Sequence, residues 1–130
     1  MAGLFAGIGG FERGLAAAGH RTELLCEIDP LAKAVLEARF PGIPLHDDIQ
    51  TLAELPRRVD LVVGGFPCQD LSQAGRTAGI AGARSGLVGD VFRLLRVRPV
   101  ENVLLENVPF MLQLAGGHAM EVVVRSFEEL

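Results

Sequence analysis

The sequence predicts a single α/β domain built on a mostly parallel sheet with helices on both faces. Runs of nearly continuous Val, Ile and Leu, such as VDLVVGGF at 59 to 66 and ENVLLE at 101 to 106, are typical of strands buried on both sides. Segments with helix start and stop signals separate these runs, and that alternation builds parallel sheets. At 130 residues and 49% hydrophobic, the chain has enough apolar material for one core.

The N-terminal elements follow this alternation. A short strand ends within Gly3 to Ala6 and leads into the glycine-rich turn AGIGG at 6 to 10. The segment FERGLAAAG at 11 to 19 predicts a helix that stops at Gly19, because glycine is favoured just beyond a helix end. TELLCEI at 22 to 28 predicts the second strand.

The next elements begin at Asp29-Pro30, an N-cap aspartate followed by a proline suited to the first helical turn. This second helix is expected to end near Phe40. The segment from Ile43 to Leu45 predicts a third strand, which leads into the acidic turn Asp47-Asp48.

The C-terminal elements start with the apolar strand at 59 to 66, which closes on a pair of glycines. The glycine-rich stretch at 69 to 86 lacks hydrophobic periodicity, and a connection of that length in a compact domain is usually functional. A helix from Leu87 to Val97, the strand at 101 to 106 and a helical tail to Leu130 complete the prediction.

Composition limits the environment and the partners. No apolar run reaches the roughly 18 residues that cross a bilayer, and the N-terminus lacks a signal-peptide pattern, so we expect a soluble, cytoplasmic protein without a membrane partner. Two cysteines are too few for a disulfide framework, and no Cys/His spacing indicates a metal site. The net charge of -4 argues against strong general affinity for phosphate backbones. Any basic surface is expected in the middle third, at Arg76, Arg84, Arg93, Arg96 and Arg98.

Residues with chemical functions follow the predicted strands. Ligands of parallel α/β sheets bind outside the carboxyl ends of the strands. The turn at 6 to 10 follows the first strand, Glu27 closes the second, and Asp48 follows the third. Pro67-Cys68 follow the fourth strand, and Glu106-Asn107 close the fifth. The sequence therefore predicts an active site at this edge of the sheet.

The glycine turn has two interpretations. It can bring the backbone close to a nucleotide-like ligand whose ribose hydroxyls bind Glu27, or it can be a tight turn that packs the first helix on the sheet. Its pattern is G-x-G-G, with Glu12 at the last glycine position of the dinucleotide fingerprint. A pyrophosphate at the helix start would meet Glu12, so a nucleoside cofactor without phosphates, such as S-adenosylmethionine, fits better.

Cys68 and Glu106 are the candidates for chemistry. A strand cysteine is most often a small hydrophobe, and we interpret Cys26 in that way. Cys68 lies beyond the apolar run at the start of a glycine-rich loop, although no histidine lies nearby in sequence to act as its base. Glu106 is a capping or salt-bridged residue in one interpretation, and in the other an acid that faces the same pocket as Cys68. A nucleophile and an acid so placed suit covalent addition to a ring with proton donation to that ring.

Three motifs, in this order and spacing, resemble the DNA cytosine-5 methyltransferase family: FAGIGGF at 5 to 11, GGFPCQDLS at 64 to 72 and LLENV at 104 to 108. Lesser matches lie between them: CEIDP at 26 to 30, HDDI at 46 to 49 and ARSGLVGDVFRLL at 83 to 95. The resemblance covers nearly the whole chain. It implies the Rossmann-like fold of S-adenosylmethionine-dependent methyltransferases.

The resemblance implies methyl transfer from S-adenosylmethionine to C5 of a cytosine that is flipped out of double-stranded DNA. Cys68 matches the nucleophile that adds to C6 of that base. Glu106 matches the residue that contacts N3, and Asn107 supports it. The loop after Cys68 resembles a catalytic loop that closes over DNA.

The resemblance also implies a set of cofactor contacts. Glu27 matches the carboxylate that holds the ribose hydroxyls, and Ile28 matches a residue that packs on adenine. Asp48 and Ile49 match further contacts to the adenine. The other matches in the cofactor and base pocket are Phe5, Gly7, Gly9, Pro67 and Leu87.

The chain departs from the family pattern in two respects. Gly3 stands where the family usually has an acidic residue, and the sequence ends after the fifth strand. We therefore expect residues 1–130 to be the N-terminal part of the catalytic domain, without the target-recognition domain, completed by a C-terminal half or a second subunit. The alternative is an inactive module that binds S-adenosylmethionine or a partner, and a dinucleotide-dependent dehydrogenase is disfavoured by the missing third glycine. A restriction-modification system and an orphan regulator both stay open.

Overall fold

The computed structural model describes residues 1–67 and 86–130, and its strands form one five-stranded sheet in the order β3-β2-β1-β4-β5. All neighbouring strands run parallel. The strands are β1 (Ala2–Leu4), β2 (Leu24–Cys26), β3 (Leu45–His46), β4 (Leu61–Gly65) and β5 (Asn102–Glu106). The predicted parallel α/β sheet is therefore confirmed, and each strand overlaps the segment expected to form it.

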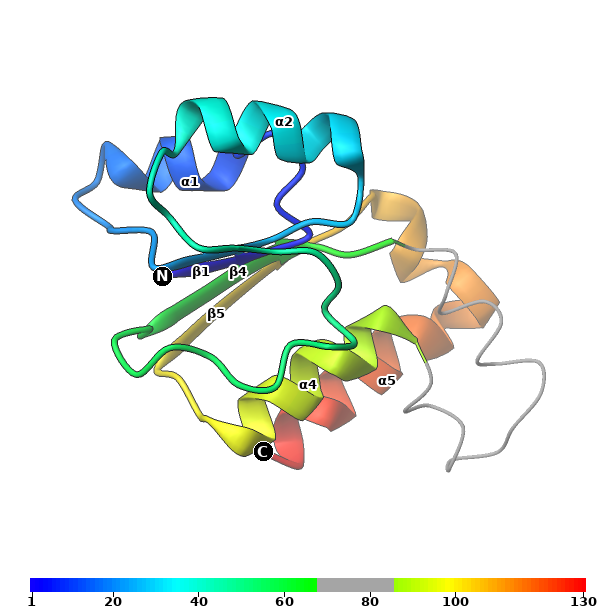
Figure 1. The fold of residues 1–130 in the computed structure, drawn as a ribbon. Helices are drawn as coiled ribbons and strands as arrows, with labels where there is room; N and C mark the ends of the chain where they lie inside the picture. The colour runs from blue at the N-terminus through cyan, green and yellow to red at the C-terminus, as the bar shows by residue number, and fades with distance from the viewer. Residues whose placement is uncertain (68–85) are drawn as a thin grey trace.

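The helices cover both faces of the sheet. In Figure 1, α1 (Gly10–Ala16) and α2 (Pro30–Arg39) lie on one face, and α4 (Leu87–Val97) and α5 (His118–Glu128) lie on the other. Two 3-10 turns, η2 (Pro109–Leu112) and η3 (Leu114–Gly117), lead into α5. α4 has the bounds that the sequence predicts, and the helical tail is confirmed by the segment from η2 to α5.

Helix α1 ends three residues before the predicted stop at Gly19. The chain tightens beyond Ala16, since the N–H of Ala18 donates to the carbonyl of Leu15 at 3.0 Å and that of Gly19 to the carbonyl of Ala16 at 3.0 Å. Gly19 then takes a left-handed conformation with a φ of 91°, and His20 donates back to Leu15 at 3.1 Å. Gly19 therefore does close the helix, through tighter turns than an α-helix has.

Helix α2 begins as the sequence predicts. One carboxylate oxygen of Asp29 accepts the N–H groups of Leu31 at 2.9 Å and Ala32 at 2.8 Å, which have no partner inside the helix. Pro30 is the first helical residue, where its missing N–H costs no bond. This start fixes the path of the chain between β2 and α2, which contains Glu27.

Apolar side chains are buried on both faces of the sheet, as the apolar strands predict. The larger cluster lies on the side of α4 and α5, where the rings of Phe92 and Phe127 meet edge to face with centroids 4.9 Å apart. The smaller cluster consists of Met1, Leu61 and Val63, against which α1 packs.

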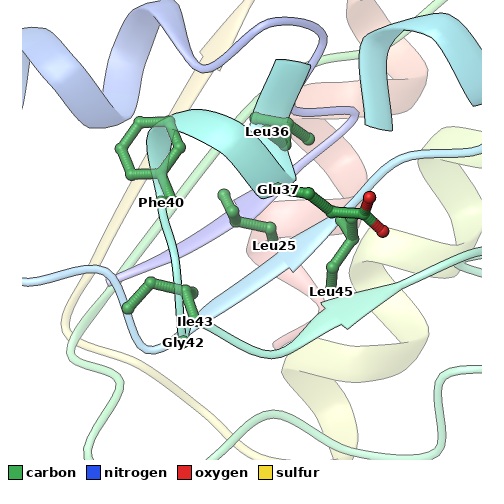
Figure 2. Close-up of a pocket in the computed structure, with 7 residues that line it drawn as sticks. All are labelled: Leu25, Leu36, Glu37, Phe40, Gly42, Ile43 and Leu45. Carbon is green, nitrogen blue, oxygen red and sulfur yellow. The ribbon is translucent and has the colours of Figure 1, made fainter. Parts of the chain in front are cut away.

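A small cavity of about 140 Å³ lies between the second half of α2 and the start of β3 (Figure 2). It is lined by Leu25, Leu36, Glu37, Phe40, Gly42, Ile43 and Leu45. Gly42 and Ile43 precede β3, whereas the predicted site residues follow the strands. No predicted site residue lines this cavity, so it is separate from the candidate site.

Two further features concern membranes and metals. No helix within residues 1–67 and 86–130 is both long and apolar enough to cross a bilayer. In the same two segments, no three His, Cys, Asp or Glu side chains are grouped as the ligands of a metal ion would be.

Candidate functional site

The carboxyl ends of the strands meet at one edge of the sheet, as the sequence predicts. The register places Leu4 of β1 beside Cys26 of β2 on one side and beside Gly64 of β4 on the other. Gly65 of β4 pairs with Glu106 of β5. The segments that follow these strands therefore emerge side by side, and they contain most of the predicted site residues.

The turn after β1 has three residues with positive φ: Phe5 at 54°, Gly7 at 54° and Gly9 at 83°. A Cβ at Gly9 would lie 2.3 Å from the ring of Phe40, so this glycine lets the start of α1 pack on α2. A Cβ at Gly7 would meet nothing within 4 Å. Gly9 thus fits the interpretation of the turn as a packing element. Gly7 fits the other interpretation, because its backbone is open to the approach of a ligand.

Glu27 holds this turn in place. One of its carboxylate oxygens accepts the N–H of Gly7 at 2.7 Å, and the other accepts the N–H of Asp29 at 2.9 Å. Charge-assisted bonds of this kind are stronger than neutral ones. Each oxygen keeps a further lone pair, so the carboxylate can still accept two hydroxyl groups.

Large apolar side chains are exposed beside Glu27. Ile28 is 71% exposed, Leu31 is 79% exposed and Ile8 is 54% exposed. Ile28 lies between β2 and α2, Leu31 lies in the first turn of α2, and Ile8 lies in the turn after β1. The surface around Glu27 therefore joins a carboxylate to uncovered apolar groups, which is a suitable surface for a nucleoside.

Asp48 and Ile49 form a tight turn after β3. One carboxylate oxygen of Asp48 accepts the N–H of Gln50 at 2.9 Å, and its carbonyl accepts the N–H of Thr51 at 3.0 Å. The side chain of Ile49 is 3% exposed and belongs to the larger core cluster. Any contact between Ile49 and a ligand must therefore come from its main chain.

The ends of β4 and β5 are joined by side chains. The amide of Asn107 donates to the carbonyl of Phe66 at 2.8 Å, and its own oxygen accepts the N–H of Val108 at 2.8 Å. A Cβ at Gly65 would lie 3.2 Å from a carboxylate oxygen of Glu106, so this exposed carboxylate lies over Gly65.

Pro67 is exposed at the end of this strand, and Cys68 lies outside the described residues. Leu87 is the first residue of α4 and is half-buried against the larger core. The structure thus places Pro67 after β4 and Glu106 and Asn107 at the neighbouring end of β5.

The side chain of Glu12, in the first turn of α1, is buried beside Gly3 of β1. Its carboxylate is 1% exposed, and neither oxygen has a hydrogen-bond partner among the described residues. One oxygen lies 1.8 Å from the position that a Cβ at Gly3 would take. Burial raises the pKa of Glu12. The expectation that a pyrophosphate at the start of α1 would meet Glu12 stays a prediction.

Cys26 is a buried thiol, as expected from its place in a strand. It is 2% exposed, and burial together with the carboxylates of Asp48, Glu27 and Asp47 raises its pKa to about 12. A thiol with so high a pKa is a poor nucleophile at neutral pH.

The arginines of the middle third do not form the basic surface that the sequence left open, as far as the described residues go. Arg93 and Arg98 donate to main-chain carbonyls of the segment between β3 and β4, and Arg96 pairs with Glu129 at 3.5 Å. The roles of Arg93 and Arg98 could not be found from sequence, because their partners lie about 40 residues away. Arg76 and Arg84 lie outside the described residues.

A family model described as C-5 cytosine-specific DNA methylase matches residues 1–130. The chain is 53% identical to the type II methyltransferase M2.BsuMI of Bacillus subtilis, over 98% of this chain and 33% of that protein. It is 37% identical to the type II methyltransferase M.PspPI of Psychrobacter sp., over 98% of this chain and 31% of that protein. The chain thus spans about a third of the length of these curated relatives.

A solved structure of a mutant DNMT2 from Spodoptera frugiperda superposes on the chain with a TM-score of 0.73 at 22% identity. The match covers 98% of this chain and 40% of that one. At this identity the similarity concerns the fold, and it agrees with the Rossmann-like methyltransferase fold expected from the motifs.

Proposed function

The chain belongs to the C-5 cytosine-specific DNA methylase family, and we propose that it is the cofactor-binding and catalytic part of an enzyme that methylates C5 of cytosine in DNA. One observation carries this proposal. Asn107 ties the end of β5 to Phe66, and the Glu106 carboxylate lies over Gly65. The carboxylate of Glu106 on β5 is thereby held beside the end of β4, and β4 leads through Pro67 to Cys68.

Cys68 is the nucleophile in this proposal. Its thiolate sulfur forms a bond to C6 of the cytosine while Glu106 donates a proton to N3, so the electron pair of the C5–C6 double bond becomes available at C5. S-adenosylmethionine, when bound, supplies the methyl group that C5 accepts. Loss of the C5 proton to solvent or a base then expels the Cys68 thiolate and restores the double bond, and N3 returns its proton to Glu106.

Glu27, Ile28 and Gly7 hold the nucleoside of S-adenosylmethionine in this proposal. The spare lone pairs of Glu27 accept the ribose hydroxyls, and exposed Ile28 offers an apolar surface to the adenine. The open side of Gly7 lets the ligand approach the backbone. Asp48, the main chain of Ile49 and Leu87 complete the set, with Phe5, Gly9 and Pro67 shaping the pocket.

We propose further that a second polypeptide part completes the enzyme. Among the described strands β5 has β4 as its one neighbour, and Leu104 on β5 is 43% exposed. Exposed strand edges pair readily with further strands. Because the chain spans about a third of the length of its relatives, a C-terminal half or a second subunit would supply the rest of the enzyme. That part would include most contacts to the duplex DNA from which the cytosine is flipped. The proposed reaction takes place inside the cell.

The test combines residues 1–130 with the C-terminal two thirds of M2.BsuMI, using radiolabelled cofactor and duplex DNA. We expect methyl transfer, and with 5-fluorocytosine DNA a stable protein–DNA adduct, because fluorine at C5 cannot leave as a proton. Cys68→Ser should abolish both, whereas Cys26→Ser, at the buried thiol, should retain both. An adduct with the Cys68→Ser protein would refute the assignment.

A binding module without catalysis is the second candidate, favoured by the net charge of -4, which argues against strong affinity for phosphate backbones. Calorimetry with S-adenosylhomocysteine separates it from the enzyme. If the wild-type chain binds this ligand but never transfers methyl groups in the complemented mixture, the module is favoured. Glu27→Ala should weaken binding by about 1.5–3 kcal/mol, the worth of a charged hydrogen bond, and Glu27→Gln by less.

A further inference from the structure

Arg93 of α4 donates hydrogen bonds to the turn that contains Asp48 and Ile49. Its Nη2 donates to the carbonyl of Ile49 at 2.7 Å, and its Nη1 donates to the carbonyl of Leu52 at 2.8 Å. Its Nε donates to Asp90, one turn earlier on the same helix, at 2.9 Å. The guanidinium plane is therefore fixed by its own helix and used to hold two carbonyls of a distant segment.

The two carbonyls belong to a compact turn. The N–H of Thr51 donates to the carbonyl of Asp48 at 3.0 Å, and the N–H of Leu52 donates to the carbonyl of Ile49 at 3.3 Å. Two hydrogen bonds from one rigid guanidinium to two carbonyls fix the orientation of this turn as well as its position, which a single point donor cannot do.

We propose that Arg93 is a positioning residue of the cofactor site. It sets the place and angle of Asp48 and the Ile49 main chain relative to α4, whose first residue is Leu87. This inference rests on the proposed function, in which those three residues belong to the binding site of S-adenosylmethionine. Arg93 acts through the turn and does not touch the ligand.

Arg98 provides a matched control within the same chain. It follows α4 directly, and it donates to the carbonyls of Pro56 at 2.9 Å, Val59 at 3.2 Å and Arg57. Both arginines thus tie α4 to the segment between β3 and β4. Arg93 holds the end next to Asp48, whereas Arg98 holds the end that leads into β4. If the arginines only anchor α4, substituting either one should lower cofactor affinity equally. If Arg93 positions the cofactor site, only its substitution should lower that affinity.

The experiment compares Arg93→Met with Arg98→Met in the full chain, since methionine keeps an apolar stem without the donors. Urea unfolding should show that both variants lose stability. Calorimetry with S-adenosylhomocysteine should show that Arg93→Met loses about tenfold in affinity, while Arg98→Met changes by about twofold or less. Arg93→Lys, with a single point donor, should lie between Arg93→Met and the wild type. If Arg93→Met does not fold, Arg93→Lys takes its place in the comparison.

Equal affinity losses in the two arginine variants, or an unchanged affinity in a folded Arg93 variant, would overturn the positioning role. If the wild-type chain binds no S-adenosylhomocysteine, the proposed function fails first. Amide hydrogen exchange then decides the inference by itself. Arg93→Met must speed exchange at Leu52 more than Arg98→Met does, and the reverse must hold at Val59, whose N–H bonds to Pro56. Any other pattern would show that Arg93 does not fix this turn.

Discussion

Replacing Gly3 by alanine should destabilise the fold, because the new methyl group would need space that the Glu12 side chain occupies. The Cβ would lie 1.8 Å from one carboxylate oxygen, 2.9 Å from Cδ and 3.4 Å from Cγ of Glu12. The strand cannot move to relieve this contact, since Gly3 is paired with Leu25 on one side and Val63 on the other. Glu12 must therefore leave its buried position.

The size of the effect follows from this geometry. Inserting a methyl group into a packed site typically costs about 1–3 kcal/mol. Glu12→Ala should cost little stability by itself, because two effects oppose each other. Removing a buried carboxylate that has no hydrogen-bond partner among the described residues recovers about 1–3 kcal/mol, whereas the cavity left behind costs stability. In the double variant the methyl group introduced at position 3 enters the vacated space. The double variant should therefore be more stable than the sum of the single effects by about 1–3 kcal/mol.

Urea unfolding followed by circular dichroism measures the stability of the wild type, the two single variants and the double variant. The dependence of the unfolding free energy on urea concentration must be equal for all four proteins. The reasoning fails if Gly3→Ala has the same cost with and without the Glu12 side chain.

A series of unfolding experiments at different pH values provides a second test. Burial raises the pKa of Glu12, so the folded state binds the proton more tightly than the unfolded state. This contribution to stability is complete at acid pH and is lost as pH rises from the ordinary glutamate pKa through the raised one, and Glu12→Gln should remove that part of the pH dependence.

Three further predictions concern single positions. Gly64→Ala should destabilise the fold by about 1–3 kcal/mol in urea unfolding, because its Cβ would lie 2.8 Å from the carbonyl oxygen of Leu4 on the paired strand, and an unchanged midpoint would contradict that close approach. Asp29→Ala should cost about 1 kcal/mol in the same assay by removing the cap of α2, with Asp29→Asn close to the wild type, and an equal cost for both would assign the effect to charge. Cys26, with a pKa of about 12 and 2% exposure, should resist alkylation at pH 8 until urea unfolds the chain, and peptide mapping that finds it labelled in the folded protein would refute this.

Local signals account for the parts of the fold that the sequence predicts well. The bounds of α4 are predicted because Gly86 precedes the helix and Pro99 follows it closely. The start of α2 is predicted because Asp29 and Pro30 act within one turn. The order of the site residues along the carboxyl edge follows from parallel strands, which place all such ends together.

Contacts between distant segments account for the parts that the sequence does not predict. Glu12 is buried because Gly3, on a neighbouring element, has no side chain, and no local pattern contains that relation. Arg93 belongs to a set of arginines that composition alone groups as a basic surface, yet its partners are carbonyls of Ile49 and Leu52. No local pattern indicates which arginine faces solvent and which faces a buried turn. Ile49 shows the same limit, since its side chain belongs to the core.

The two halves of the candidate site are held in different ways, and this difference bears on the order of binding. The cofactor half is already organised by charged groups: Glu27 fixes Gly7 and Asp29, and Arg93 fixes the turn after β3. Binding there needs little further ordering, so little affinity is lost to it. The catalytic half lies on β5, which has one neighbour among the described strands, and its acid, Glu106, is exposed. In the proposed reaction Glu106 donates a proton to N3, and we expect DNA or the completing part to exclude water from this exposed position. The proposed enzyme is therefore expected to bind its cofactor before its catalytic half is assembled.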